Sequence, residues 1–221
     1  MITRSLLLAG FFLSLTGVAA RADVIVEVQD ATVSPNGTGY IDILISGTAS
    51  DNLDSFQISA SITGSVANGS LIFSAAQPDI SAEADYVFLG DSGGYSGTQG
   101  SPTTDVSAFD GTTSFLGVTL TGTKKLVARF AFEHTETGVS VGDTYTVTLT
   151  GVGTDPLNDS TWFADSSITG LTIDLGASDL SGTITVASAV PEPGPLVLLG
   201  LSVCVGGGRH LLRRPKQPTQ V

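Results

Sequence analysis

The residue best suited to acid–base chemistry between positions 23 and 190 is His134, the only histidine in that stretch. A hydrolase with a catalytic triad would use such a histidine as the base that activates a serine. One histidine cannot build a multi-histidine zinc site. His134 stands at the end of an expected strand, beside Glu133, so we predict an exposed histidine without a catalytic role.

Carboxylates are the most numerous reactive groups, because 20 of the 21 Asp and Glu residues lie between positions 23 and 190. Two facing carboxylates can hydrolyse a glycosidic bond, but among 20 acids the spacing selects no pair. Trp162 and Phe163 are the candidate contacts to a sugar or a partner protein. Trp162, the only tryptophan, also suits packing at the end of a core.

Two short acidic segments are candidates for calcium binding, because calcium prefers several oxygen ligands and tolerates irregular loops. One contains Asp51 and Asp54, and the other contains Asp155 and Asp159. Neither matches the Asp-x-Asp-x-Asp-Gly loop of EF-hands, and turn formation is the alternative role of these residues. The sequence indicates no cofactor beyond this calcium hypothesis.

The charge of the region between the two ends excludes a large class of partners. Its only basic residues are Lys124, Lys125 and Arg129, which against 20 acids leave a net charge of −17. Nucleic acid is therefore excluded as a partner, since phosphate binding needs clustered Lys and Arg. The only cysteine, Cys204, lies near the C-terminus, so this region has no thiol or disulfide and depends on its core.

The elements that must position these residues read as strands. Apolar and polar residues alternate along segments such as 40–46, 56–63, 124–132 and 144–150, and Gly, Pro and Asx turns separate the segments. Further strands are expected at 24–33, 70–74, 115–121, 168–175 and 182–187. Asn68-Gly69 is a hairpin signal, and 75–105 reads as a long loop. The pattern predicts an all-β protein, an antiparallel β-sandwich of about nine strands.

The N-terminus has the order of a signal peptide. A positive charge near Met1 precedes an apolar run that is too short to span a membrane comfortably. Ala20 and Ala22 supply the small side chains that signal peptidase accepts, so we expect cleavage of residues 1–22 and a mature chain that begins at Asp23. This order predicts export.

The C-terminus has three parts: Pro191-Glu192-Pro193, the apolar stretch Gly194–Gly208, and a basic end that includes Arg213 and Arg214. The stretch of 15 residues is shorter than the roughly 20 that cross a membrane. The order resembles the PEP-CTERM sorting signal, and we assign it to residues 188–221. A plain membrane anchor is the alternative, but Pro-Glu-Pro has no role in one.

The PEP-CTERM resemblance implies that the chain is the substrate of an exosortase and not an enzyme. It implies a short apolar helix with transient association to the inner membrane, followed by transfer to the cell surface or the exopolysaccharide matrix. Between the two ends, strand order across residues 23–187 resembles cohesins, nine-stranded jelly-roll sandwiches that bind dockerins. No diagnostic motif accompanies this second resemblance, so no dockerin-binding residue follows from it.

These observations predict an exported, noncatalytic surface or matrix protein whose sandwich serves adhesion or matrix assembly. Its expected partners are signal peptidase and exosortase during export, and then exopolysaccharide or another surface protein. A carbohydrate-binding module is the alternative function, and a secreted hydrolase is the third.

Overall fold

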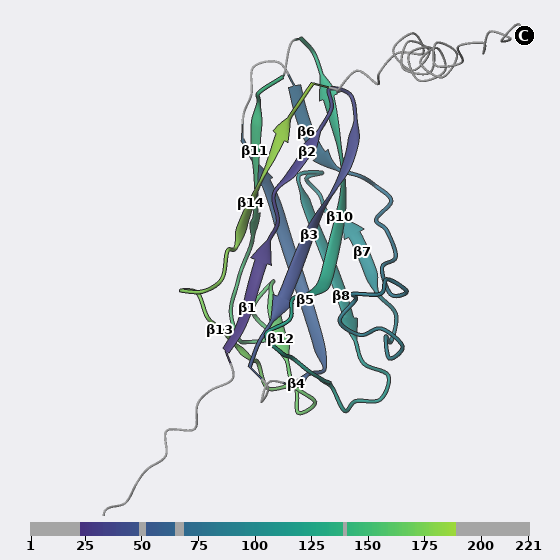
Figure 1. The fold of residues 1–221 in the computed structure, drawn as a ribbon, viewed down its shortest axis with the longest axis vertical. Helices are drawn as coiled ribbons and strands as arrows, with labels where there is room; N and C mark the ends of the chain where they lie inside the picture. Colours follow the sequence, from purple (N-terminus) through teal and green to yellow (C-terminus); the bar gives the residue numbers. More distant parts are fainter. Residues whose placement is uncertain (1–22, 49–51, 65–68, 139–140, 189–221) are drawn as a thin grey trace, which may run out of the picture.

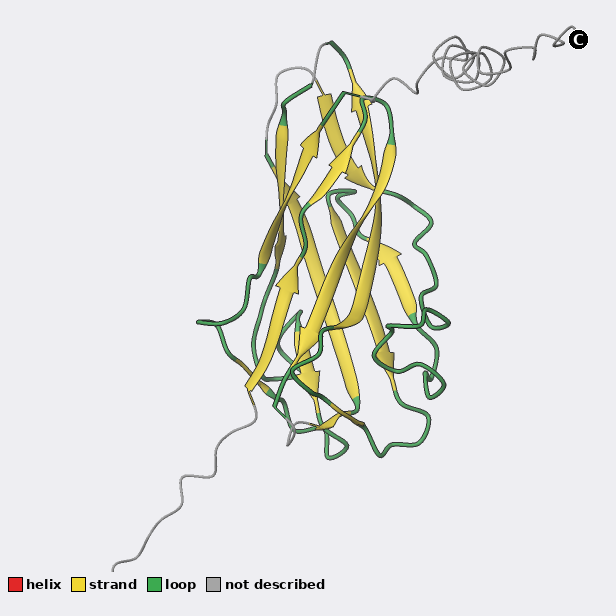
Figure 2. Cartoon of the chain, in the orientation of Figure 1, coloured by secondary structure: helices red, strands yellow, loops and turns green. Residues whose placement is uncertain are grey.

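The computed structural model describes residues 23–48, 52–64, 69–138 and 141–188. Every regular element in these ranges is a strand, and the strands form two main sheets that pack face to face (Figures 1 and 2). The predicted all-β sandwich is confirmed. No helix in the described ranges is long and apolar enough to cross a membrane. The predicted signal peptide lies outside these ranges, as does the predicted sorting signal except for Ser188.

The first sheet has five strands in the order β13-β1-β3-β10-β6. The strands are β13 (Thr172–Ile173), β1 (Asp23–Val28), β3 (Thr38–Ser46), β10 (Lys125–Glu136) and β6 (Gly69–Phe73). All neighbours are antiparallel except β1 and β13, which pair in parallel.

The second sheet has the order β2-β14-β11-β5-β8-β7, and β12 pairs with β5 beside this path. The strands are β2 (Ala31–Val33), β14 (Ser181–Val186), β11 (Thr144–Leu149), β5 (Ser55–Thr63), β8 (Asp105–Gly111), β7 (Ser96–Gln99) and β12 (Trp162–Ala164). A small ribbon joins β4 (Asn52–Leu53) to β9 (Val118–Thr119). Only the β14–β2 pair of the second sheet is parallel.

The core lies between the sheets and follows the alternation seen in the sequence. Every second side chain of β5, from Phe56 to Ile62, is buried, and the residues between them are partly exposed. Ile41, Ile43 and Ile45 of β3 are buried opposite them in the first sheet. Each large apolar side chain that is fully buried in this way contributes about 1.5–3 kcal/mol to folding.

The expected strand 24–33 is two strands in different sheets. β1 belongs to the first sheet, and after Gln29 the chain crosses to place β2 at the edge of the second. The crossing runs close to β14: a Cβ atom on Gly182 would lie only 2.4 Å from the carbonyl oxygen of Gln29. Alternation has the same period in either sheet, so it does not reveal where a chain changes sheets.

The hairpin expected at Asn68-Gly69 does not form, because β5 and β6 belong to different sheets. Two other expected strands, 115–121 and 168–175, shrink to the two-residue strands β9 and β13. Phe115 and Ile168 have positive φ angles of 55° and 58°, a backbone conformation that no strand accommodates. The apolar side chains of Phe115 and Ile168 are largely exposed, although their hydrophobic character favoured buried strands in the sequence pattern.

The segment 75–105, predicted to be a loop without strands, contains β7 and packs against the sandwich. Ile80, Tyr86, Phe88 and Tyr95 are buried within it. The ring of Phe88 stacks on Phe56 of β5 with centroids 5.7 Å apart. The aromatic residues of this segment show no alternation, because the segment packs through irregular turns, and the sequence pattern therefore did not indicate a core element.

Burial of Tyr95 predicts a loss of stability at alkaline pH. Desolvation raises the pKa of Tyr95 to about 12, from 10.0. The folded state therefore holds the phenolic proton more tightly than the unfolded state. The stability that results is present below pH 10 and disappears as the pH rises through 12. We expect Tyr95→Phe to lose less stability than the wild type between these pH values in urea unfolding followed by circular dichroism. Equal losses would contradict this expectation.

Candidate functional site

The outer face of the second sheet is rich in hydroxyl groups. We define this hydroxyl face by ten outward-pointing Ser and Thr residues of four adjacent strands: Ser181, Thr183 and Thr185 of β14; Thr144, Thr146 and Thr148 of β11; Ser59, Ser61 and Thr63 of β5; and Ser107 of β8. The residues between them point inward and form the core.

Strand register aligns these hydroxyls in rows across the sheet. Thr183 of β14 lies opposite Thr146 of β11, which in turn lies opposite Thr63 of β5. A neighbouring row joins Thr185 to Thr144. Strand geometry spaces the residues about 4.8 Å apart within a row and about 6.7 Å from one row to the next. The hydroxyl face is therefore a two-dimensional array and not a set of isolated residues.

Most hydroxyls of this array have no hydrogen-bond partner among the residues that the structure describes. Among the ten residues that define the hydroxyl face, only Thr63 makes a side-chain hydrogen bond within the described structure: its hydroxyl donates to the carbonyl oxygen of Thr146 at 3.4 Å. The other hydroxyls are available to solvent or to a ligand. Each can both donate and accept a hydrogen bond.

The hydroxyl face is almost uncharged, although the domain is strongly acidic. Asp105 of β8 is the only charged residue at the outward positions of β14, β11, β5 and β8. The outer side of the first sheet differs, because Asp42 and Arg129 form an ion pair there at 2.7 Å and Glu133 is exposed. A ligand of the hydroxyl face therefore needs hydrogen-bonding groups more than charge.

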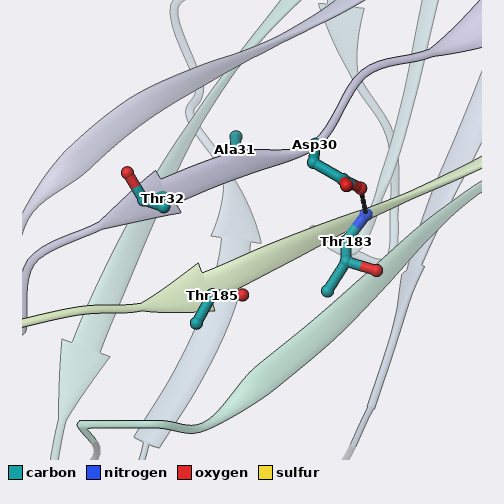
Figure 3. Close-up of a pocket in the computed structure, with 5 residues that line it drawn as sticks. All are labelled: Asp30, Ala31, Thr32, Thr183 and Thr185. Carbon is teal, nitrogen blue, oxygen red and sulfur yellow. Dashed lines mark hydrogen bonds between the residues drawn. The ribbon is translucent and has the colours of Figure 1, made fainter.

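Two shallow pockets lie along this face. One, of about 520 Å³, is lined by Ser59, Ser61, Ser107 and their neighbours beside Asp105. The other, of about 470 Å³, lies where β2 runs beside β14, and Figure 3 shows Thr183 and Thr185 lining it. There the backbone N–H of Thr183 donates to the Asp30 carboxylate at 2.7 Å.

Aromatic residues close one end of the hydroxyl face. Phe109 of β8 points outward and is 48% exposed. Gln57 of β5 pairs with both Phe109 and Trp162, and the Trp162 ring meets Phe109 edge-on with centroids 6.4 Å apart. Phe109 also lines a pocket of about 440 Å³ with Phe115, which is 73% exposed.

The structure separates the two aromatic residues predicted as contacts. Phe163 is fully buried and packs against Phe56 at 6.5 Å, so it belongs to the core. Trp162 lies on the outer side of the sheet but is only 7% exposed, and it supports Phe109. The sequence reasoning missed Phe109, which the alternation along Val106–Asp110 places on the outer side.

His134 is buried and not exposed, so that prediction is wrong. Only 2% of the residue is exposed, and its ring faces Tyr145 of β11 with centroids 5.9 Å apart. His134 continues the inward series of Phe130 and Phe132 along β10. Strand alternation therefore decides its position despite its polarity.

The buried imidazole offers a direct test of its role. Neither ring nitrogen of His134 has a hydrogen-bond partner within the described structure. Leaving a buried polar group unpaired costs about 1–3 kcal/mol. We expect His134→Leu to raise the free energy of unfolding by about 1 kcal/mol in urea, whereas Glu133→Gln at the exposed neighbouring position changes it little. A loss of stability in His134→Leu would show that the imidazole has a structural partner.

A segment with the spacing of a serine-hydrolase nucleophile turn occurs at Gly90–Gly94, with Ser92 at its centre. The Ser92 hydroxyl donates to the Asp110 carboxylate at 2.5 Å. A nucleophile turn requires a helix directly after the serine, and in the described structure no helix follows this segment. His134 offers Ser92 no hydrogen bond, so these residues form no catalytic pair.

Only one of the two aspartates of the first calcium candidate lies in the described structure. Asp51 lies outside the described residues. Asp54 is buried, and its carboxylate accepts a hydrogen bond from the Thr112 hydroxyl. In the described ranges no three His, Cys, Asp or Glu side chains come together to hold a metal.

The second calcium candidate forms a closed turn. The Asp159 carboxylate accepts the backbone N–H of Asp155 at 2.7 Å, and Asp155 accepts the N–H of Leu157 at 2.9 Å. Hydrogen bonds from Asn158 and Leu157 lower the pKa of Asp155. Calcium binding here stays a prediction. If calcium binds, we expect the Tm of the protein to be higher in millimolar calcium than in chelator. An unchanged Tm would rule out the calcium site.

The residues predicted to direct export lie almost entirely outside the described structure. These are Ala20, Ala22, Pro191, Glu192, Pro193, Arg213 and Arg214. Asp23, the expected first residue of the mature chain, opens β1 and pairs with Thr172.

Comparison with known proteins defines the class of fold. No protein-family model and no curated protein sequence matches the chain. Among solved structures, the chain is similar to the sixth cohesin of scaffoldin B from Acetivibrio cellulolyticus, solved in complex with a Cel5 dockerin. The TM-score is 0.50 at 11% identity, over 74% of this chain and 99% of the cohesin.

A second solved structure agrees. The seventh ScaB type I cohesin from Pseudobacteroides cellulosolvens matches with a TM-score of 0.51 at 15% identity, over 76% of this chain and 95% of the cohesin. The fold of this chain is therefore a cohesin-like β-sandwich, which confirms that part of the sequence prediction. At these identities the similarity defines the fold alone.

Proposed function

We propose that this chain is an exported, noncatalytic adhesion module of the cell surface or extracellular matrix, and that it binds its partner through the hydroxyl face. The observation that carries the proposal is this array of unpaired hydroxyls on a rigid, cohesin-like sandwich. The solved cohesin bound to a dockerin supports a binding role, since it shows a sandwich of this class holding a partner.

The arrangement of the reactive side chains supports a noncatalytic role. Nucleophilic catalysis by a serine needs a histidine base within hydrogen-bond reach of the serine hydroxyl. His134 is closed off between the sheets, and Ser92 is bonded to Asp110. Neither residue faces one of the three pockets on the outer side of the second sheet.

Export and sorting rest on the two ends of the sequence. Signal peptidase would cleave before Asp23, and an exosortase would recognise Pro191-Glu192-Pro193 with the apolar stretch and basic end that follow. The apolar segment would hold the chain transiently at the inner membrane before transfer to the surface or matrix.

The intact mass of the protein recovered from its native cell tests this proposal. We expect an N-terminus at Asp23 and a C-terminus near Pro191, with the protein accessible to protease added outside the cell. Deletion of Pro191-Glu192-Pro193 should give a longer, mislocalised product. Deletion of Pro218-Thr219-Gln220, which lies beyond all the basic residues, is the matched control and should leave sorting intact. A native C-terminus at Val221 would contradict the sorting signal.

A further inference from the structure

We infer that the hydroxyl face binds a neutral polysaccharide chain, an inference that rests on the proposed adhesive function and names its ligand class. The array crosses four strands, and its central row runs through Thr183, Thr146 and Thr63. A polysaccharide presents repeated hydroxyls of its own, so both surfaces can donate and accept hydrogen bonds at many points.

The composition of the face favours a sugar polymer over a protein partner. Protein–protein interfaces draw most of their affinity from Trp, Tyr and Arg in desolvated pockets, and Ser and Thr are under-represented among such residues. The central positions of the hydroxyl face are all Ser or Thr, and the aromatic Phe109 lies at one end. The centre of this array therefore offers a protein partner none of the Trp, Tyr or Arg side chains that anchor such interfaces.

The threonine side chains of the hydroxyl face are preorganised for binding. Their β-branched side chains have few accessible rotamers, and the sheet holds each backbone in place. Thr146 and Thr183, opposite each other in adjacent strands, therefore lose little conformational freedom when a ligand binds. Two rigid neighbouring hydroxyls can bridge one sugar unit, and the next row repeats the arrangement.

Charge decides between neutral and anionic polymers. The domain carries a net charge of −17, so long-range repulsion opposes an anionic polysaccharide. Along the face the charged side chains are Asp105, at an outward position of β8, and Asp30, which lines the pocket beside β14. Their carboxylates can accept hydrogen bonds from sugar hydroxyls. At the end of the array Phe109, supported by Trp162, offers an apolar surface to the face of a sugar ring.

Affinity electrophoresis of the full chain, purified in detergent, tests the inference. The probes are laminarin, dextran and hydroxyethylcellulose as neutral glucans, and alginate as an anionic polymer. We expect retardation by at least one neutral glucan and none by alginate. The double variant Thr146→Val/Thr183→Val removes two hydroxyls but keeps shape and strand preference, and it should weaken binding about tenfold. The matched control, Thr38→Val, changes an exposed threonine outside the array and should bind normally.

Three results would overturn the inference: no retardation by any neutral glucan, equal retardation by alginate, or equal binding by the wild type and the double variant. Unchanged Tm values of the valine variants confirm that each has folded. If mass and protease accessibility establish export and sorting but no glucan binds, the ligand class is wrong and the proposed function stands. If the chain stays inside the cell, the proposed function fails whatever the electrophoresis shows.

Discussion

Asp110→Ala is expected to lower the free energy of unfolding by about 3–5 kcal/mol, a large share of the stability of a domain this size, because several buried donors lose their acceptor. Asp110 is almost fully buried. Its carboxylate accepts hydrogen bonds from the hydroxyls of Tyr86 and Ser92, each at 2.5 Å. It also accepts the backbone N–H groups of Gly111 at 2.7 Å and Gly94 at 3.1 Å. Alanine would leave these donors without their acceptor.

The Tyr86 phenol makes this loss especially costly, because it is buried and has no route to water. Burial, and then the hydrogen bond to Asp110, hold the pKa of Tyr86 well above its ordinary value. Urea unfolding followed by the fluorescence of Trp162 measures the effect. Ser92→Ala removes one donor and leaves the carboxylate in place, so we expect a loss of about 1 kcal/mol. Equal losses in the two variants would show that Asp110 does not organise this network.

Phe56→Ala is expected to lower the free energy of unfolding by about 3–5 kcal/mol through the cavity it leaves. Phe56 of β5 is fully buried and lies at the centre of the aromatic core. Its ring stacks on Phe88 at 5.7 Å and contacts Phe163 at 6.5 Å. The variant should therefore also loosen the segment 75–105, which contains Phe88.

The matched control for Phe56→Ala is Phe109→Ala, which removes the same atoms from the outer side of the same sheet. Phe109 is about half exposed, so we expect a loss below about 1 kcal/mol. Urea unfolding measures both variants, and limited proteolysis reports on the segment 75–105. Similar losses at the two positions would contradict the assignment of Phe56 to the core and Phe109 to the surface.

Phe56 and His134 show how far strand periodicity predicts which side chains face the core. Alternation along 56–63 predicts correctly that Phe56 faces the core, because a strand has a period of two. The same rule applied to His134 places it inside, but its polarity argued for exposure and led to the wrong prediction. Where periodicity and residue type disagree within this core, periodicity decides.

Local patterns also failed where the chain changes sheets. Asn68-Gly69 has the composition of a hairpin turn, but β5 and β6 pair with different neighbours. The expected strand 24–33 divides at Gln29 for the same reason. Pairing depends on contacts between residues far apart in the chain, and no short-range signal encodes it.

The sequence by itself determined the all-β class, the acidic and cysteine-free character of the domain, and the threonine at every second place of Thr144–Thr148. Only the tertiary structure decided that these threonines meet those of β14 and β5 in register, because Thr146 pairs with Thr183 and Thr63, which lie 37 and 83 residues away in the chain. It also decided that Phe109 borders this array while Phe163 turns into the core. Alternation assigns a side chain to one side of its own strand, whereas a binding face arises only when several strands pair.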